Sequence, residues 1–245
     1  MLRRGGRSRE DERRVSELHE RRQELVKQLV VTERFARQLE SLSNAQCAAL
    51  AAAAAERLLP VYARFREEEG WGEYEFLRNG LDSVWNALAG RQPAADLRAP
   101  SLQDESRTVP DLGGDERWKS EWVAEAQDAA ISVLTAMDAM ANDDRESALH
   151  ALQHEIDAVE NCIARNEARP STRPPAGGDT LVHALEQQIE REETTIGHPL
   201  IRETLEIIEH NLETVRSTAT ITADVVGALK ASAEQQSVTA RLDRT

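Results

Sequence analysis

Large aromatic side chains gather in one stretch of this chain, residues 56–85, and this feature constrains its fold most strongly. The sequence contains three Phe, four Trp and two Tyr, and six of these nine residues lie in that stretch. Each aromatic ring buries a large apolar area, so the stretch must supply most of the directional packing of a core. Gly70-Trp71-Gly72 lies in the middle of it and is typical of a tight turn between two helices.

Apolar residues recur at spacings of three and four along most of the chain, and no segment keeps the period of two that a half-buried strand shows. We therefore predict an all-α protein that forms a compact multi-helix bundle with a long N-terminal coiled-coil-like helix. Pro60 is expected to kink or break the second helix, because it lacks a backbone donor. The periodicity predicts helices over residues 10–42, 45–59, 61–69, 73–89, 115–142, 145–168, 181–193 and 200–216.

Composition divides the chain into three predicted parts. Residues 1–42 form an N-terminal extension with a disordered start and a heptad-like helix. Residues 43–216 form the helical domain, interrupted by a flexible Pro/Gly linker at 169–179. Residues 217–245 form a Thr/Ala-rich tail that holds a marginal helix at best. The N-terminal helix either joins two copies of the chain as a homodimer through residues 10–42 or packs back on the domain.

The chain is acidic, with 30 Lys and Arg residues against 44 Asp and Glu residues and a net charge of −14. Residues 1–40 carry a net charge of +3, so the remainder carries −17. Such a body repels phosphate backbones and anionic lipid. We expect no nucleic-acid binding through the main domain and no membrane binding, whereas a basic protein partner fits the charge.

Other features of the sequence point to a cytoplasmic protein. The start of the chain has no apolar segment of the kind found in secretory signals. The longest apolar run, Cys47 to Ala55, is far too short to span a bilayer. Cys47 and Cys162 have no metal-ligand spacing and are expected to be buried and reduced.

One set of residues matches a known family pattern. It comprises Glu56-Arg57-Leu58-Leu59-Pro60, Tyr62, Phe65, Gly70-Trp71-Gly72, Leu77-Arg78, Leu81-Asp82 and Val84-Trp85, with a second block at Val109-Pro110-Asp111-Leu112 and 125–130. In these residues the chain resembles the family typified by the YjaG proteins, small helical bacterial proteins catalogued as a domain of unknown function. The resemblance covers residues 39–216. It implies a compact helical domain, with no established activity, cofactor or catalytic residue to carry over.

Several charged residues interrupt apolar helix faces, where a charge must be paired or exposed. These residues are Glu56, Arg57, Arg78, Asp82 and Asp128. Arg78 and Asp82 are four residues apart and can pair on one helix surface. Either the set converges on a polar site that binds a metal or a cationic ligand, as carboxylates do inside helical bundles, or it forms ion pairs that fix helix register. The second interpretation is preferred.

Two further candidate groups carry weaker signals. His150 and His154 lie one helical turn apart and could share a metal ion, although their order does not match a metalloprotease or di-iron motif and their neighbours favour solvent exposure. Tyr62, Trp71 and Trp85 could form an aromatic surface for a ligand, although such spacing is more typical of a core. No catalytic residue and no cofactor is predicted, since nucleotide-binding and nucleophile motifs are absent from the sequence.

Three functions remain open on the sequence alone. The leading hypothesis is a non-catalytic protein-interaction or regulatory factor, such as an immunity-type protein that neutralises a basic toxin or nuclease. The first alternative is a metal- or ligand-binding helical-bundle enzyme that uses buried carboxylates. The second is a structural homodimer joined through residues 10–42.

Overall fold

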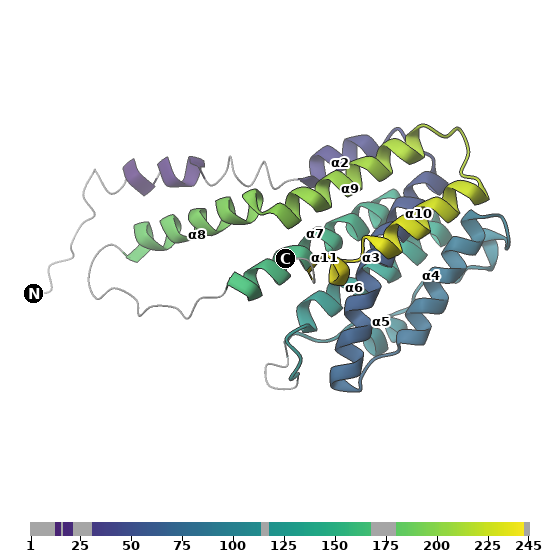
Figure 1. Cartoon of the computed structure of the whole chain (residues 1–245), viewed down its shortest axis with the longest axis horizontal. Helices are drawn as coiled ribbons and strands as arrows, with labels where there is room; N and C mark the ends of the chain where they lie inside the picture. The colour runs from purple at the N-terminus through teal and green to yellow at the C-terminus, as the bar shows by residue number, and fades with distance from the viewer. Residues whose placement is uncertain (1–12, 16, 22–30, 114–117, 168–179, 243–245) are drawn as a thin grey trace, which may run out of the picture.

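The computed structural model of the chain describes residues 13–15, 17–21, 31–113, 118–167 and 180–242. Helices dominate these residues, and no strand occurs among them (Figure 1). The predicted all-α bundle is confirmed. The elements are α2 (Val31–Leu39), α3 (Asn44–Glu69), α4 (Tyr74–Leu88), the 3-10 helix η1 (Ala94–Asp96), α5 (Leu102–Thr108), α6 (Val123–Asn142), α7 (Arg145–Glu167), α8 (Thr180–Gly197), α9 (Pro199–Arg216), α10 (Ala223–Gln235) and α11 (Val238–Leu242).

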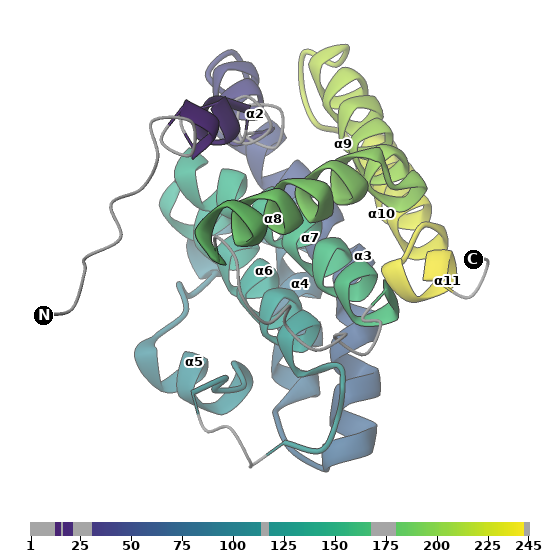
Figure 2. The ribbon, with the colours of Figure 1, turned by 90° about the vertical axis from the view of Figure 1, so that its left-hand side faces the viewer.

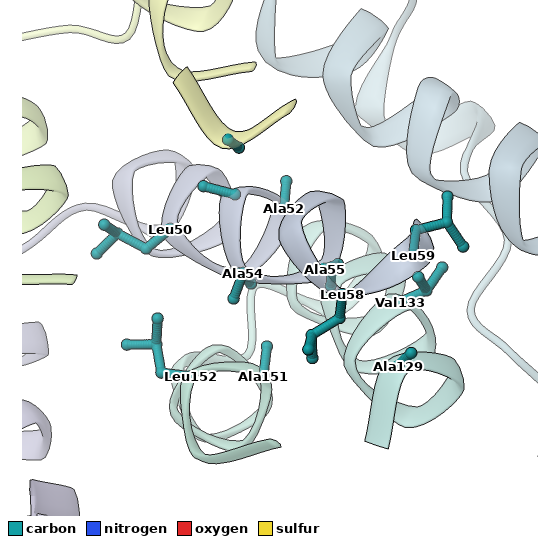
Figure 3. Packing of buried hydrophobic residues seen from close by; sticks show 14 of the residues in the cluster. Leu50, Ala52, Ala54, Ala55, Leu58, Leu59, Ala129, Val133, Ala151 and Leu152 are labelled. Atoms are coloured by element: carbon teal, nitrogen blue, oxygen red, sulfur yellow. The ribbon is translucent and has the colours of Figure 1, made fainter. Parts of the chain in front are cut away.

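Helix α3 is the central helix and packs against α4, α6, α7, α9, α10 and α11. Seven alanines between positions 48 and 55 are completely buried. Their methyl groups let the neighbouring helices approach closely, because the distance between packed helices depends on the side chains at the contact. Figure 3 shows part of this contact, with labelled residues from α3 (Leu50, Ala52, Ala54, Ala55, Leu58, Leu59), α6 (Ala129, Val133) and α7 (Ala151, Leu152).

Pro60 does not end helix α3, which continues to Glu69. The loss of one backbone hydrogen bond is offset by packing on both sides of the proline, since Leu59 and Val61 are buried. The helix begins at a capping box in which Ser43 and Gln46 exchange hydrogen bonds. The Gln46 side chain also donates to the Val215 carbonyl at 2.6 Å and so joins the start of α3 to the end of α9.

The Gly70-Trp71-Gly72 turn joins α3 to α4, as expected. Gly70 caps α3 in the left-handed conformation, with φ of 65°. Gly72 also has a positive φ, and a Cβ atom there would overlap the hydroxyl of Tyr62. Glycine is therefore required at position 72 by both conformation and space.

The segment after residue 217 contains more structure than a marginal helix. Helices α10 and α11 both pack against α3, and α10 also packs against α4. Val226, Leu229 and Val238 are buried there. The predicted domain boundaries at 42 and 216 stay predictions.

The connection from residue 90 to 114 also contains helices that periodicity did not predict, namely η1 and α5. The helix predicted over 115–142 begins later than expected, at Val123, the first residue of α6. Trp118 precedes it and packs edge-on against Trp71, with ring centroids 5.0 Å apart. Prolines at 93, 100 and 110 obscured these boundaries in the sequence.

The described N-terminal residues, 13–15 and 17–21, lie beside α8, as both views of the ribbon show (Figures 1 and 2). Arg14 pairs with Glu186 at 2.5 Å, and Arg21 donates to Glu193 at 2.9 Å. The two pairs have the same sequence offset, so the segment runs parallel to α8. The middle of the predicted N-terminal helix, residues 22–30, lies outside the described residues, as do the predicted disordered start and the linker at 169–179.

Candidate functional site

The first charged cluster joins α3, α4 and α10. Arg78 of α4 donates to both carboxylate oxygens of Glu56, at 2.5 and 3.0 Å, and to Asp82 at 2.8 Å. Lys230 of α10 donates to Asp82 at 2.8 Å, and the Trp85 indole donates to Glu56 at 2.8 Å. Two acids thus face two bases. The cluster is balanced in charge and fixes the positions of three helices.

The pKa of Asp82 follows from these contacts. Burial by itself would raise it, but the hydrogen bonds from Lys230 and Arg78 and their positive charges hold the pKa below its ordinary value. Asp82 therefore stays ionised as part of an ion pair. A general base or a metal ligand would need a free carboxylate, which this pairing does not leave.

The second cluster lies at the centre of the bundle, where α3, α7, α9 and α11 meet. Arg57 donates to both oxygens of Glu155 at 2.6 Å, and both residues are completely buried. Arg241 of α11 lies 3.6 Å from Glu155 and donates to the Thr204 hydroxyl at 2.7 Å. A bidentate arginine–carboxylate pair is among the strongest charged contacts in proteins. Arg57 thus belongs to a different cluster from Glu56, although the two residues are adjacent in sequence.

The third cluster lies between α6 and α7 and contains Asp128. One oxygen of Asp128 lies 2.9 Å from Nδ1 of His154, and the other accepts a hydrogen bond from Asn161 at 3.0 Å. Asp157 lies one turn after His154 on α7, and its carboxylate accepts a hydrogen bond from Gln153 at 2.7 Å. This cluster holds the only combination of three His, Cys, Asp or Glu side chains in the described residues with ligand atoms all within 4.8 Å of one another.

The five charged residues that the sequence singled out do not converge. Glu56, Arg78 and Asp82 meet in one cluster, Arg57 belongs to the second, and Asp128 belongs to the third. Helix geometry explains the separation of Glu56 and Arg57, because adjacent residues project about 100° apart around the axis.

The candidate aromatic residues contribute to the core. Tyr62 and Trp85 are buried, with exposed fractions of 0% and 3%. Trp71 is partly buried and packs edge-on against Phe65, with ring centroids 6.2 Å apart. They do not form the aromatic surface that the sequence allowed.

The two candidate histidines are in different surroundings. His150 is exposed and belongs to no group of potential metal ligands in the described residues, whereas His154 contacts Asp128. The sequence placed both in solvent because their immediate neighbours are polar. It could not show which residues of α6 face them.

A groove of about 700 Å³ lies between α5 with its flanking residues and α6. Among the described residues, its lining combines apolar side chains with three carboxylates and contains no Lys or Arg. The residues on the α5 side are Pro100, Leu102, Glu105, Ser106, Val109, Pro110 and Asp111, and those on α6 are Gln127, Ile131, Leu134, Thr135 and Asp138. Leu102 is 82% exposed, the highest value among large apolar side chains of the described residues.

A buried carboxylate joins α5 to the residues that precede it. Asp104 accepts hydrogen bonds from Arg98 and Arg107, both at 2.7 Å, and from Ser101. The hydrogen bond from Arg98 lowers the pKa of Asp104 most, and the bonds from Ser101 and Arg107 lower it further. Burial alone would raise this pKa, but the hydrogen bonds hold it well below its ordinary value. Gln127 of α6 donates to the carbonyl of Pro110 at 2.9 Å and ties the far end of the groove wall to α6.

Several of these residues were missed by sequence reasoning. A signal was present for Glu155, which lies three residues after Leu152 and four before Val159 on the apolar face of α7. A signal was also present for Asp157, which shares a helix face with His154. Leu102 lies in a proline-rich connection without periodicity, and no sequence pattern indicated that it borders a groove.

Comparison with known families places the chain. Its sequence matches the family described as "Protein of unknown function (DUF416)" over residues 34–240. The chain belongs to the DUF416 family. The DUF416 match begins within α2 and ends within α11, so it includes α10, the three charged clusters up to residue 240 and the groove.

A solved DUF416 structure supports the fold. The crystal structure of a DUF416 family protein from Shewanella baltica OS155 is similar to this chain, with 22% sequence identity and a TM-score of 0.60 over 80% of this chain and 91% of that chain. At this identity the likeness extends to the fold alone. No curated protein matches the sequence. Among the described helices, none combines the length and apolarity needed to cross a membrane.

Proposed function

We propose that this DUF416 chain is a non-catalytic protein-interaction factor whose α5–α6 groove binds an amphipathic, basic segment of a partner protein. The observation that carries the proposal is the chemistry of the groove, in which an apolar surface is bordered by carboxylates and by the exposed Leu102. An amphipathic helix that lies in such a groove places its apolar stripe on the floor and its polar residues at the rim.

The charge of the groove supports a basic partner. Glu105 and Asp111 are exposed, Asp138 is half-buried, and none of the described residues that line the groove is Lys or Arg. The chain as a whole carries a net charge of −14, which would attract a basic partner from a distance and raise the rate of association.

The enzyme alternative has less support. Glu56 and Asp82 are each held by Arg78, and Glu155 is held by Arg57, so these acids are engaged in ion pairs. Homodimer formation through residues 10–42 stays a prediction, as do an immunity-type role and the specific likeness to YjaG proteins. A cytoplasmic location is likewise a prediction.

A selection experiment tests the proposed groove. Peptides that bind the full chain are selected from a random displayed library, and each is then measured against a Leu102→Asp variant. Burial of one leucine contributes about 1.5–3 kcal/mol, so the variant is expected to raise Kd by roughly tenfold or more. We also expect Lys and Arg to be enriched in the selected peptides, and a Glu105→Lys variant to weaken them further.

Leu112→Asp provides the matched control, because Leu112 is also exposed and does not line the groove. Circular dichroism checks that both variants keep their helical content. The proposal would be contradicted by selected peptides that lack basic residues, by equal Kd values for the Leu102 and Leu112 variants, or by a library that yields no binder.

A further inference from the structure

Asp128 differs from the other buried carboxylates of the described residues. Five acidic side chains there are buried, and four of them pair with arginine. These four pairs are Glu56 with Arg78, Asp104 with Arg98 and Arg107, Glu125 with Arg165, and Glu155 with Arg57. Asp128 instead contacts His154 and Asn161, and no Lys or Arg of the described residues forms an ion pair with it.

Negative charge accumulates around Asp128. Asp157, half-buried on α7, brings a second carboxylate close to Asp128. Glu160, also half-buried on α7, adds a third, and burial together with the charge of Asp157 raises the pKa of Glu160 to about 7. None of these three carboxylates forms an ion pair with Lys or Arg among the described residues, whereas the other four buried acids each pair with arginine. A bound cation would supply a positive charge beside them.

The donor atoms have the spacing of metal ligands. Oδ1 of Asp128 and Nδ1 of His154 lie 2.9 Å apart. One ligand atom from each of Asp128, His154 and Asp157 lies within 4.8 Å of the other two. Ligand atoms about 2.1 Å from an ion are separated by about 3 Å when they occupy adjacent coordination positions. The side chains of His154 and Asp128 are 23% and 11% exposed, so an ion can reach them from solvent.

Neighbouring amides orient the two carboxylates. Asn161 donates to Oδ2 of Asp128 at 3.0 Å, and Gln153 donates to Oδ1 of Asp157 at 2.7 Å. These contacts restrict the orientation of both carboxylates. Such outer contacts are a regular feature of metal sites, where they hold the ligands in position.

We propose that Asp128, His154 and Asp157 form a binding site for a divalent transition-metal ion. One imidazole and two carboxylates are typical ligands of zinc, cobalt, manganese and iron. Calcium and magnesium prefer sites made of oxygen ligands alone, so the imidazole disfavours them. Three protein ligands leave one or more coordination positions for water or a further ligand. The imidazole binds as the neutral form, and the ion then replaces its present hydrogen bond to Asp128. The site lies where α6 meets α7, and none of its three residues lines the groove.

Metal titration of the full chain tests this site. The protein is first treated with a chelator and dialysed, and zinc chloride binding is then measured by isothermal titration calorimetry. We expect one zinc ion per chain and a higher Tm in the presence of zinc. Cobalt chloride gives a second readout, since a nitrogen and oxygen donor set produces visible absorption bands that differ from those of aqueous cobalt. Calcium and magnesium are expected to bind at least tenfold more weakly than zinc.

Three variants separate a metal site from a hydrogen-bond network. Asp157→Asn and His154→Gln are expected to raise the Kd for zinc at least tenfold, whereas His150→Gln, on the same helix and exposed, should leave it unchanged. Asp157→Asn should preserve the fold, because Asp157 is half-buried and accepts its hydrogen bond from Gln153 of the same helix. The proposal is overturned if wild-type protein binds no zinc, or if the His154 and His150 variants bind it equally. In either case the cluster only ties α6 to α7.

Discussion

His154 and Glu155 are neighbours on α7, but each belongs to a different contact between helices. Glu155 is a buried acid that pairs with an arginine of α3, whereas His154 contacts Asp128, a buried acid of α6 that has no arginine partner among the described residues. Glu155 is completely buried and held by Arg57 through two contacts of 2.6 Å. His154 is partly exposed and lies 2.9 Å from Asp128. Arginine stays charged at every physiological pH, whereas imidazole and crowded carboxylates change protonation. At the dry contact the buried acid is therefore neutralised by a permanent charge, whereas at the wetter contact the acid faces an imidazole and an amide.

The largest effect is expected for Glu155→Gln. The change leaves Arg57 and Arg241 buried without a countercharge, and removal of one partner from a buried pair costs about 3–5 kcal/mol. We expect the free energy of unfolding to fall by that amount in a urea titration.

Glu146→Gln serves as the control, because Glu146 is exposed on the same helix and should change stability by no more than about 0.5 kcal/mol. Replacing Arg57 and Glu155 together with Met and Leu should cost less than the two single changes combined. A loss below about 1 kcal/mol for Glu155→Gln would contradict this prediction, since Arg57 and Arg241 would then not need Glu155 as a countercharge.

An intermediate, pH-dependent effect is expected for Glu160→Gln. The pKa of Glu160 is raised to about 7, so the folded state holds a proton that the unfolded state has released between pH 4.5 and 7. Wild-type stability therefore falls as the pH rises through this range. At pH 8 the variant should be more stable than wild type by about 1–2 kcal/mol after allowance for partial exposure, and at pH 4 the two should be equal.

Thermal unfolding at pH 4 and pH 8 checks this prediction, with Glu206→Gln on the exposed face of α9 as control. A difference that is the same at both pH values would indicate a packing effect. The stability effect of Glu160 would then not come from its titration.

The smallest effect is expected for Lys230→Met. Lys230 and Asp82 are 31% and 42% exposed, and Asp82 retains Arg78 when the lysine is removed. The expected loss is about 0.5 kcal/mol or less, and it should shrink further in 1 M salt. Urea titrations at two salt concentrations measure it. A loss above about 1.5 kcal/mol would mean that even the exposed edge of the charged network behaves like the buried centre.

The sequence predicted the long amphipathic helices well. Helix α7 was expected over 145–168 and observed over Arg145–Glu167, and α9 was expected over 200–216 and observed over Pro199–Arg216. In both, apolar residues recur at helical spacing over several turns. The seven-residue α5 is too short for such a pattern. A capping box at Ser101 and Asp104 was its local signal, hidden among prolines.

The grouping of the charged residues was less predictable. Local pattern correctly indicated that Arg78 and Asp82 pair, because both lie on α4 four residues apart. The partners of Arg57 and Asp128 come from α7, and a single sequence does not show which helices lie side by side. Helix geometry does indicate that Glu56 and Arg57 point in different directions, since adjacent residues project about 100° apart around the axis.

The position of Arg241 has a consequence for the order of folding. Its guanidinium is buried beside Glu155 and Thr204, which come from α7 and α9. Docking of the five-residue α11 would bury an uncompensated charge unless those helices had already assembled. The last step of folding is therefore expected to be the attachment of α11, and its detachment should be the earliest local opening seen by hydrogen exchange.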